Sequence, residues 1–220
     1  MQLSAQTLTV LKNFSLINPS IRFQPGNVVK TISAQRTIVA SATIEESFDA
    51  QFCIFDLNRF LSVLTLFNDP TVEVDGKFIS IKSGPKKISY IGADESHLML
   101  PPDVIKMPNA EIQFNLTNEM LTDLTKAMSI LGLPEVAIVG NGEKLSIVAI
   151  DTKGIIQDGY SREIGDTNQT FKIIFAIENL KLLPADYTVS IGRKGDKGLS
   201  HFSAKGLDYY IAVEAKSTYE

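Results

Sequence analysis

Short apolar and β-branched runs dominate the chain and predict mainly β-strands. Turn signals separate these runs, and the Asn141-Gly142 pair between two apolar stretches predicts a hairpin. In the first half we expect strands at residues 15–23, 28–33, 37–43, 50–55, 71–74, 78–81 and 87–91. In the second half we expect them at residues 111–116, 136–139, 145–150, 154–159, 171–175, 187–191, 199–204 and 209–214.

Four segments show the spacing of amphipathic helices instead. The first follows Ser4 and gathers Leu8, Leu11 and Phe14 on one side. The others are expected at residues 56–67, 117–131 and, as a short helix, 177–183. Each half then combines a sheet with two helices on one face, which predicts an α+β fold.

The two halves repeat one pattern. Residues 4–11 reappear as residues 117–124, an offset of 113 positions, and each copy opens with a hydroxyl residue and keeps two leucine-type positions. A second echo relates residues 54–61 to residues 175–182, where an apolar strand runs into a helix that carries a cation. A duplicated chain of this kind builds a symmetrical surface and does not enclose one catalytic pocket.

An extended connector joins the halves. Residues 96–108 contain three prolines, which remove backbone donors and stiffen the path. We place the boundary at Pro108, so that the domains are 1–108 and 109–220. At 220 residues, the chain is long enough for two domains that each bury a core.

Composition narrows the functional classes. The net charge of −4 argues against a general nucleic-acid binder, which usually carries a large positive excess. No apolar run is long enough to span a membrane, and the start of the chain lacks a secretory signal pattern. The single cysteine, Cys53, lies in an apolar run and fits a buried residue in a reducing cytoplasm.

The positions of the cations on the predicted helices are more informative about function than the net charge. Lys12, Arg59 and Lys126 each lie away from the apolar stripe of a predicted helix, and Lys181 belongs to the short fourth helix at a less defined angle. Such isolated cations suit phosphates of a DNA backbone, without base reading and with strong salt dependence. The alternative is that they are ordinary solvated faces of amphipathic helices.

Other chemistry is sparse. His97, His201 and Cys53 have no metal-ligand spacing, and the positions of the two histidines suggest no shared catalytic pocket, so we expect no metal and no cofactor. The Glu45-Glu46 pair is expected between strands in solvent. Two other functional classes stay open: a structural or assembly protein of duplicated β-rich domains, and an enzyme with its site at the domain interface.

Three segments carry a resemblance to a known family. Residues 11–18, residues 54–69 and the terminal stretch 210–218 resemble the sliding clamp of T-even-like bacteriophages. The resemblance implies a homotrimeric ring of six similar domains, with helices lining a central hole through which duplex DNA passes. It places DNA contacts at Lys12, Arg59, Lys126 and Lys181, and the acidic balance then repels DNA from the outer surface.

The same resemblance implies partners and further sites. Such clamps tether the replicative DNA polymerase, are opened by an ATP-driven clamp loader and assist late transcription, in the cytoplasm of the infected bacterial host. Their subunits pair edge to edge, which here implies interface residues at Lys87, Ile88, Tyr90, Ile155, Ile156 and Tyr160. Partner peptides dock beside the connector, where the candidate pocket residues are Leu98, Met99, Leu100 and Ile105.

Overall fold

The computed structural model describes residues 1–195 and 197–219. It divides into two compact units, Met1–Val104 with Gly206–Asp208 and Ile105–Lys205 with Tyr209–Glu220. Each unit combines antiparallel sheet with helix, so the predicted α+β class is confirmed. The exact boundary at Pro108 stays a prediction.

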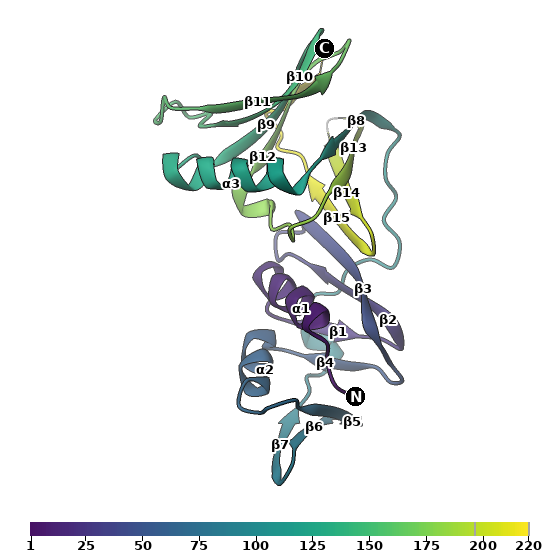
Figure 1. Ribbon diagram of the computed structural model, residues 1–220. Coiled ribbons are helices and arrows are strands. Elements are labelled where there is room, and N and C mark those ends of the chain that lie inside the picture. Colours follow the sequence, from purple (N-terminus) through teal and green to yellow (C-terminus); the bar gives the residue numbers. More distant parts are fainter. Residues whose placement is uncertain (196, 220) are drawn as a thin grey trace. The chain divides into compact units, whose positions relative to one another are not determined.

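The first unit has two sheets and two α-helices (Figure 1). Four strands run in the order β4-β1-β2-β3, and a separate three-stranded sheet has the order β5-β6-β7. The elements are α1 (Ala5–Ile17), β1 (Ile21–Phe23), β2 (Gly26–Ile32), β3 (Ile38–Phe48), β4 (Phe52–Ile54), α2 (Leu57–Leu64), β5 (Thr71–Asp75), β6 (Phe78–Ser83), β7 (Lys86–Ile91) and the 3₁₀ turn η1 (Glu95–His97).

Helix α1 packs on β3 and on α2 because its apolar residues share one face. Leu11 and Phe14 are completely buried there. In the sheet of the same unit, Phe23 and Phe52 stack with ring centroids 4.5 Å apart, and Phe48 meets both rings edge-on. Aromatic rings in these geometries contribute beyond their buried area.

The second unit also has two sheets, but only one α-helix. Its strands run in the orders β15-β14-β13-β8 and β11-β10-β9-β12-β16. The elements are β8 (Ala110–Leu116), α3 (Asn118–Leu131), β9 (Glu135–Asn141), β10 (Lys144–Ile150), β11 (Tyr160–Asp166), β12 (Thr170–Ala176), the 3₁₀ turn η2 (Ile177–Asn179), β13 (Tyr187–Lys194), β14 (Lys197–Ala204), β15 (Leu207–Ala212) and β16 (Thr218–Tyr219).

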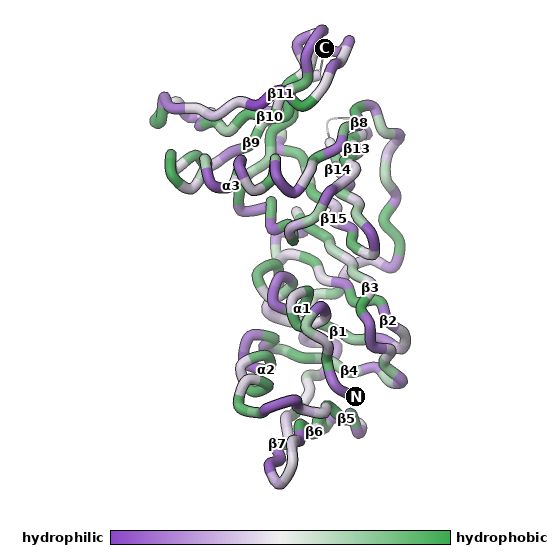
Figure 2. Tube along the Cα trace, in the orientation of Figure 1, coloured by the Kyte–Doolittle hydropathy of each residue, from purple (hydrophilic) through white to green (hydrophobic). Residues whose placement is uncertain are grey.

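Helix α3 lies across β10 and β11 and buries Leu121, Leu124 and Met128. Figure 2 shows hydrophobic and hydrophilic residues alternating along this helix, as its two-sided environment requires. The helix ends at Gly132, whose φ of 68° is a left-handed conformation that glycine adopts without strain. The predicted hairpin at Asn141-Gly142 is confirmed, since it joins β9 to β10.

The predicted strand at 15–23 is largely wrong. Helix α1 continues to Ile17, and only Ile21–Phe23 form a strand. Asn18 makes the change of direction, because its amide donates to the Ile32 carbonyl at 2.8 Å and its oxygen accepts from the Ser20 amide at 2.9 Å. The apolar residues of the helix continue directly into those of the short strand, so the sequence pattern does not show where the helix ends.

The predicted strand at 154–159 is also wrong. The side-chain carboxylate of Asp151 accepts the backbone N–H groups of Lys153, Ile155 and Ile156, so these donors are unavailable for sheet pairing. The strand β11 starts only at Tyr160. Residues 154–159 therefore form a loop whose backbone is held by hydrogen bonds to the Asp151 carboxylate.

The predicted fourth helix at 177–183 is reduced to the single 3₁₀ turn η2. No side chain caps its start, whereas Asp56 caps α2 at the corresponding place in the first unit. Leu183 instead donates its N–H to the Tyr209 hydroxyl at 3.3 Å and accepts from the Tyr187 hydroxyl at 2.6 Å. Pro184 further disfavours helix at the residue before it.

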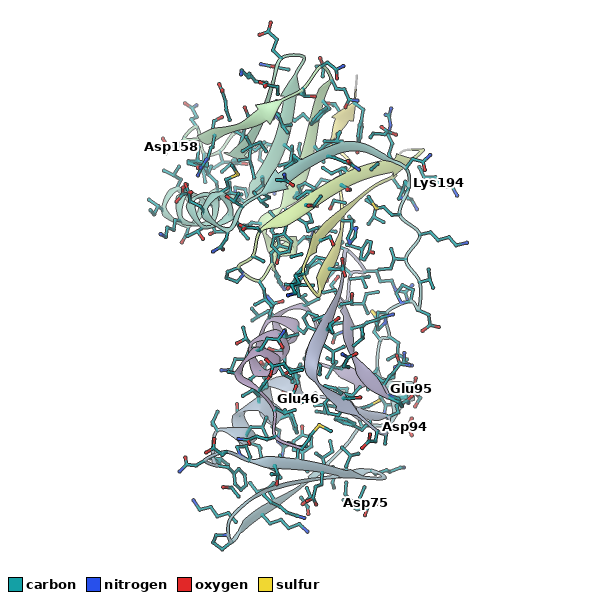
Figure 3. The ribbon with its side chains drawn as sticks, turned by 45° about the vertical axis from the view of Figure 1, so that its right-hand side comes forward. Glu46, Asp75, Asp94, Glu95, Asp158 and Lys194 are labelled. Atoms are coloured by element: carbon teal, nitrogen blue, oxygen red, sulfur yellow. The ribbon has the colours of Figure 1, made fainter. Side chains whose placement is uncertain are left out.

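Glu46 is not the solvated residue that the sequence predicts. Its carboxylate faces the start of α1, beside which Figure 3 labels it, and accepts hydrogen bonds from the Ser4 backbone N–H and the Thr7 hydroxyl. Burial alone would raise the pKa of Glu46, but these hydrogen bonds outweigh it and the pKa lies below its ordinary value. The negative charge also suits the positive end of the helix dipole.

We expect Glu46→Gln to lower the free energy of unfolding by about 1 kcal/mol at neutral pH, as loss of a capping contact does. Because the folded pKa lies below the unfolded value, this contribution is complete above the unfolded pKa of about 4.3 and is lost as pH falls through the folded pKa. Urea unfolding at fixed protein concentration from pH 7 to pH 3 measures the difference.

Glu45→Gln is the matched control, because Glu45 is the exposed neighbour on the same strand. It should change the free energy of unfolding by less than about 0.5 kcal/mol. Equal effects of the two substitutions would contradict a capping role for Glu46.

Candidate nucleic-acid interface

The first unit presents two cations on adjacent helices. Helices α1 and α2 pack side by side (Figure 1), and Lys12 on α1 and Arg59 on α2 are both exposed. Burial of Leu11 and Phe14 on one helix, and of Phe60 and Leu64 on the other, fixes which faces remain outside. The predicted outward placement of both cations is what these burial patterns produce.

Lys12 borders a hollow of about 270 Å³ between the two helices and the start of β5. Its walls are mainly apolar and include Leu8, Leu61 and Leu64. The aliphatic stem of a lysine covers apolar surface of this kind while the ammonium stays in water. Lys12 therefore offers a mobile point charge at the helix surface.

Arg59 lies in the first turn of α2. Its backbone N–H donates to the Asp56 carboxylate at 2.8 Å, and its side chain borders a hollow of about 430 Å³ beside β7. Tyr90 lines the same hollow and meets the Phe60 ring edge-on with centroids 5.5 Å apart. Burial raises the pKa of Tyr90, Arg59 opposes that shift and Asp56 adds to it.

The second unit presents one cation from α3. Thr117 caps this helix by accepting the Met120 N–H at 3.2 Å, just as Ser4 caps α1 by accepting the Thr7 N–H at 3.1 Å. The hydroxyl residues that open the two sequence copies thus perform the same task. Lys126 is exposed, on the side opposite the buried Leu124.

Lys181 departs from the expected pattern. It lies after η2, outside any helix, and is half-buried. The repeat between the halves aligns Lys181 with Phe60 of α2, which is buried. The sequence therefore gives no clear direction for the Lys181 side chain around a helix axis. The expectation of a fourth helix-borne cation is therefore corrected to a loop residue.

The residues predicted for the subunit interface are split between strand and loop. Lys87, Ile88 and Tyr90 lie on β7, an edge strand of its sheet. Tyr160 opens β11, which is also an edge strand, whereas Ile155 and Ile156 belong to the loop before it.

Phe78, Ile91 and Ile130 are exposed apolar residues that the sequence analysis did not assign to a site, and they join the predicted Ile155. Phe78 and Ile91 stand opposite each other on β6 and β7 and are 58% and 69% exposed. Ile130 and Ile155 are 82% and 80% exposed in the second unit. Only their exposure in the folded units distinguishes them from core residues, since their local patterns look like those of buried strand and helix positions.

The candidate pocket residues lie in the connector. Leu98 ends η1 and is half-buried with Leu100, while Met99 is 37% exposed. These three belong to the first unit, and the half-buried Ile105 opens the second. Their role as a docking pocket stays a prediction.

In the described ranges 1–195 and 197–219, no group of three or more histidine, cysteine, aspartate or glutamate side chains could hold a metal ion. Cys53 is buried, and burial raises its pKa. Within the same ranges, none of the helices has the length and apolar character needed to cross a bilayer.

Comparisons with known proteins match both halves of the chain. A family model described as DNA polymerase processivity factor matches residues 4–100, and one described as gp45 sliding clamp, C terminal, matches residues 113–215. The sliding clamp of Vibrio phage KVP40 is 30% identical over 98% of this chain and 100% of that protein. The sliding clamp of Enterobacteria phage T4 is 30% identical over the full length of both.

The fold agrees with these sequence matches. PCNA from Thermococcus kodakaraensis superposes with a TM-score of 0.68 at 16% identity, covering 95% of this chain and 96% of that one. At that identity the likeness shows the fold alone. Together with the full-length sequence matches, it establishes that the chain belongs to the phage sliding-clamp family.

Proposed function

We propose that the chain is a DNA sliding clamp whose copies close into a homotrimeric ring around duplex DNA and tether the replicative polymerase. The observation that carries this proposal is the set of exposed cations on α1, α2 and α3, in a chain of the sliding-clamp family. Three copies would bring nine such cations to one inner wall. The protein would act in the cytoplasm of the infected bacterial host, without catalytic activity of its own.

The expected DNA contacts are weak individually. Lysine is a point charge that meets phosphates without fixing a register along the duplex, so the ring can slide. The overall charge of −4 repels the duplex from other surfaces and favours it where the cations gather. Lasting attachment would come from encirclement, not from the strength of these contacts.

Ring closure would join β7 of one copy to β11 of the next. Both are edge strands with backbone groups available for pairing. The β7 side carries Lys86 and Lys87 with exposed Phe78 and Ile91, which would meet a β11 side that carries Glu163 and exposed Ile155. Asp158, labelled in Figure 3, adds to the acidic charge of the loop before β11. Opposite charges and apolar side chains on two different edges favour a head-to-tail contact.

The connector would serve partner proteins. Leu98, Met99, Leu100 and Ile105 offer apolar contacts in an extended segment, which suits capture of short peptides from the polymerase, the clamp loader and late-transcription factors. One shared docking site would make these partners compete and so separate loading, replication and transcription in time.

Charge reversal at Lys12, Arg59 or Lys126 should weaken duplex binding. Each substitution to Glu removes a phosphate contact from every subunit and should lower the salt dependence of binding by up to about 3 in the log–log slope for a trimer. Fluorescence anisotropy with a short duplex from 50 to about 300 mM salt measures this. Lys181→Glu should have a smaller effect, because Lys181 is half-buried outside a helix.

Lys172→Glu is the control for the change in net charge, because Lys172 is exposed on β12 and not on a helix. It should leave the salt slope unchanged. If Lys172→Glu and Lys126→Glu reduce binding equally, the helix faces are not the DNA surface.

Ile91→Glu should break the ring. A carboxylate in place of an apolar side chain at the β7 edge removes buried apolar area and would face the acidic β11 side. We expect the mass by analytical ultracentrifugation to fall from about three times 24.2 kDa toward 24.2 kDa at micromolar concentration. Val28→Glu, at an exposed position in the interior strand β2, should leave the trimer intact. A wild-type monomer would contradict the ring itself.

Met99→Glu should separate tethering from encirclement. It should lower polymerase processivity by more than about tenfold, as loss of an interface anchor does, while trimer mass and duplex affinity stay at wild-type values. Val104→Glu is the matched control, because Val104 is 74% exposed in the same connector but outside the candidate pocket. Equal loss in both variants would count against a defined pocket.

A further inference from the structure

The outward ridge of α3 carries two acids as well as its lysine. Glu119 and Asp123 are one helical turn apart, and Lys126 follows three residues later, so all three share one face. The two acidic side chains are 74% and 46% exposed. Left alone, this ridge would be net negative and would oppose a phosphate backbone.

One arginine from the neighbouring edge strand offsets both acids. Arg162 on β11 places one terminal nitrogen 3.0 Å from Glu119 and the other 2.9 Å from Asp123. Its side chain is only 29% exposed. A planar guanidinium holds two carboxylates at once in a way that lysine cannot, and with Lys126 it brings the charge of the ridge to zero.

Helix α1 of the first unit has no acids at the corresponding positions, so it needs no arginine to balance them. The offset of 113 residues places the exposed, neutral Gln6 of α1 where α3 has Glu119, and the buried Val10 where α3 has Asp123, so α1 carries no acid at either position. Helix α1 takes its N-terminal negative charge from Glu46 on β3, whereas α3 carries Glu119 in its own first turn in addition to Asp186, which accepts the Asn118 N–H. An acid there stabilises the helix dipole, but it also lies on the outward ridge.

We propose that Arg162 is a charge-balancing residue that makes the α3 surface compatible with duplex DNA. The inference rests on the proposed function, because it requires α3 to face the duplex. Arg162 acts through the two acids. Its guanidinium offsets the negative charge of Glu119 and Asp123, which would otherwise repel DNA phosphates that pass within a Debye length. Lys126 can then attract those phosphates. Glu119 in turn places a negative charge in the first turn of α3, where it suits the helix dipole.

Arg162→Gln tests the proposal in the full-length ring. We expect affinity for a short duplex at about 0.1 M salt to fall about fivefold, and the difference to vanish near 1 M salt, where charges are screened. The triple variant R162Q/E119Q/D123N should regain wild-type affinity within about twofold, because it removes the charges that Arg162 balances. Arg162→Lys keeps the positive charge but cannot hold both carboxylates at once, so its affinity should lie between those of the wild type and Arg162→Gln.

Arg22→Gln is the matched control, since Arg22 on β1 pairs with Glu95 on η1 at 2.5 Å and belongs to none of the helices that carry the cations. It should leave duplex affinity unchanged. Trimer mass is measured for every variant, because β11 is also the proposed ring edge.

Three results would overturn the inference while the clamp function stands: wild-type affinity in Arg162→Gln, no recovery in the triple variant, or loss of the trimer in Arg162→Gln, which would assign the arginine to ring closure. A wild-type protein that forms no ring and binds no duplex would refute the proposed function itself. The two failures are therefore distinguishable.

Discussion

Burial of one apolar face on each helix is the constraint from which the surface of this protein follows. Isolated helices of 13 or 14 residues are marginal in water, so α1 and α3 persist because Leu11 and Phe14, or Leu124 and Met128, pack against a sheet. Once those faces are fixed, the opposite faces are fixed as well. Lys12 and Lys126 are exposed for the same reason that the leucines are not.

The start of each helix adds a second requirement with consequences for charge. Both helices place a hydroxyl side chain at the N-cap and a carboxylate near their positive end. In α1 the carboxylate comes sideways from Glu46 on the sheet and leaves the outward face free of acids. In α3, Asp186 accepts the Asn118 N–H at 2.7 Å, and a second carboxylate, Glu119, comes from the helix itself and is paired with Arg162. The duplication therefore conserves the need for a cap but not its source.

These differences explain what the sequence could and could not reveal. Helical periodicity, the N-cap hydroxyls and the Asn141-Gly142 turn are local signals, and they predict α1, α3 and the hairpin because no distant contact opposes them. The failures depend on contacts distant in sequence or on one side-chain group: Tyr187 and Tyr209 hold Leu183 in place of a helix, and the Asp151 carboxylate removes donors from a strand. The prediction of Lys181 on a helix is wrong because these distant contacts replace the helix. The pairing of Arg162 with two acids on α3 also depends on residues distant in sequence, so no local pattern predicts it.

Weak contacts and a near-neutral ridge are consistent requirements for a protein that must hold DNA and still move along it. Strong cationic clusters would fix the ring to one place, whereas exposed acids facing the duplex would exclude it. Helices α1 and α2 each carry one exposed cation, and the outward ridge of α3 has no net charge. This surface is therefore neither strongly cationic nor acidic. In the proposed ring, persistence would come from the edges β7 and β11, where Ile91 on β7 and Ile155 in the loop before β11 are exposed. In the proposed ring, closure supplies the lifetime on DNA, and the helices supply only a surface that the duplex can pass.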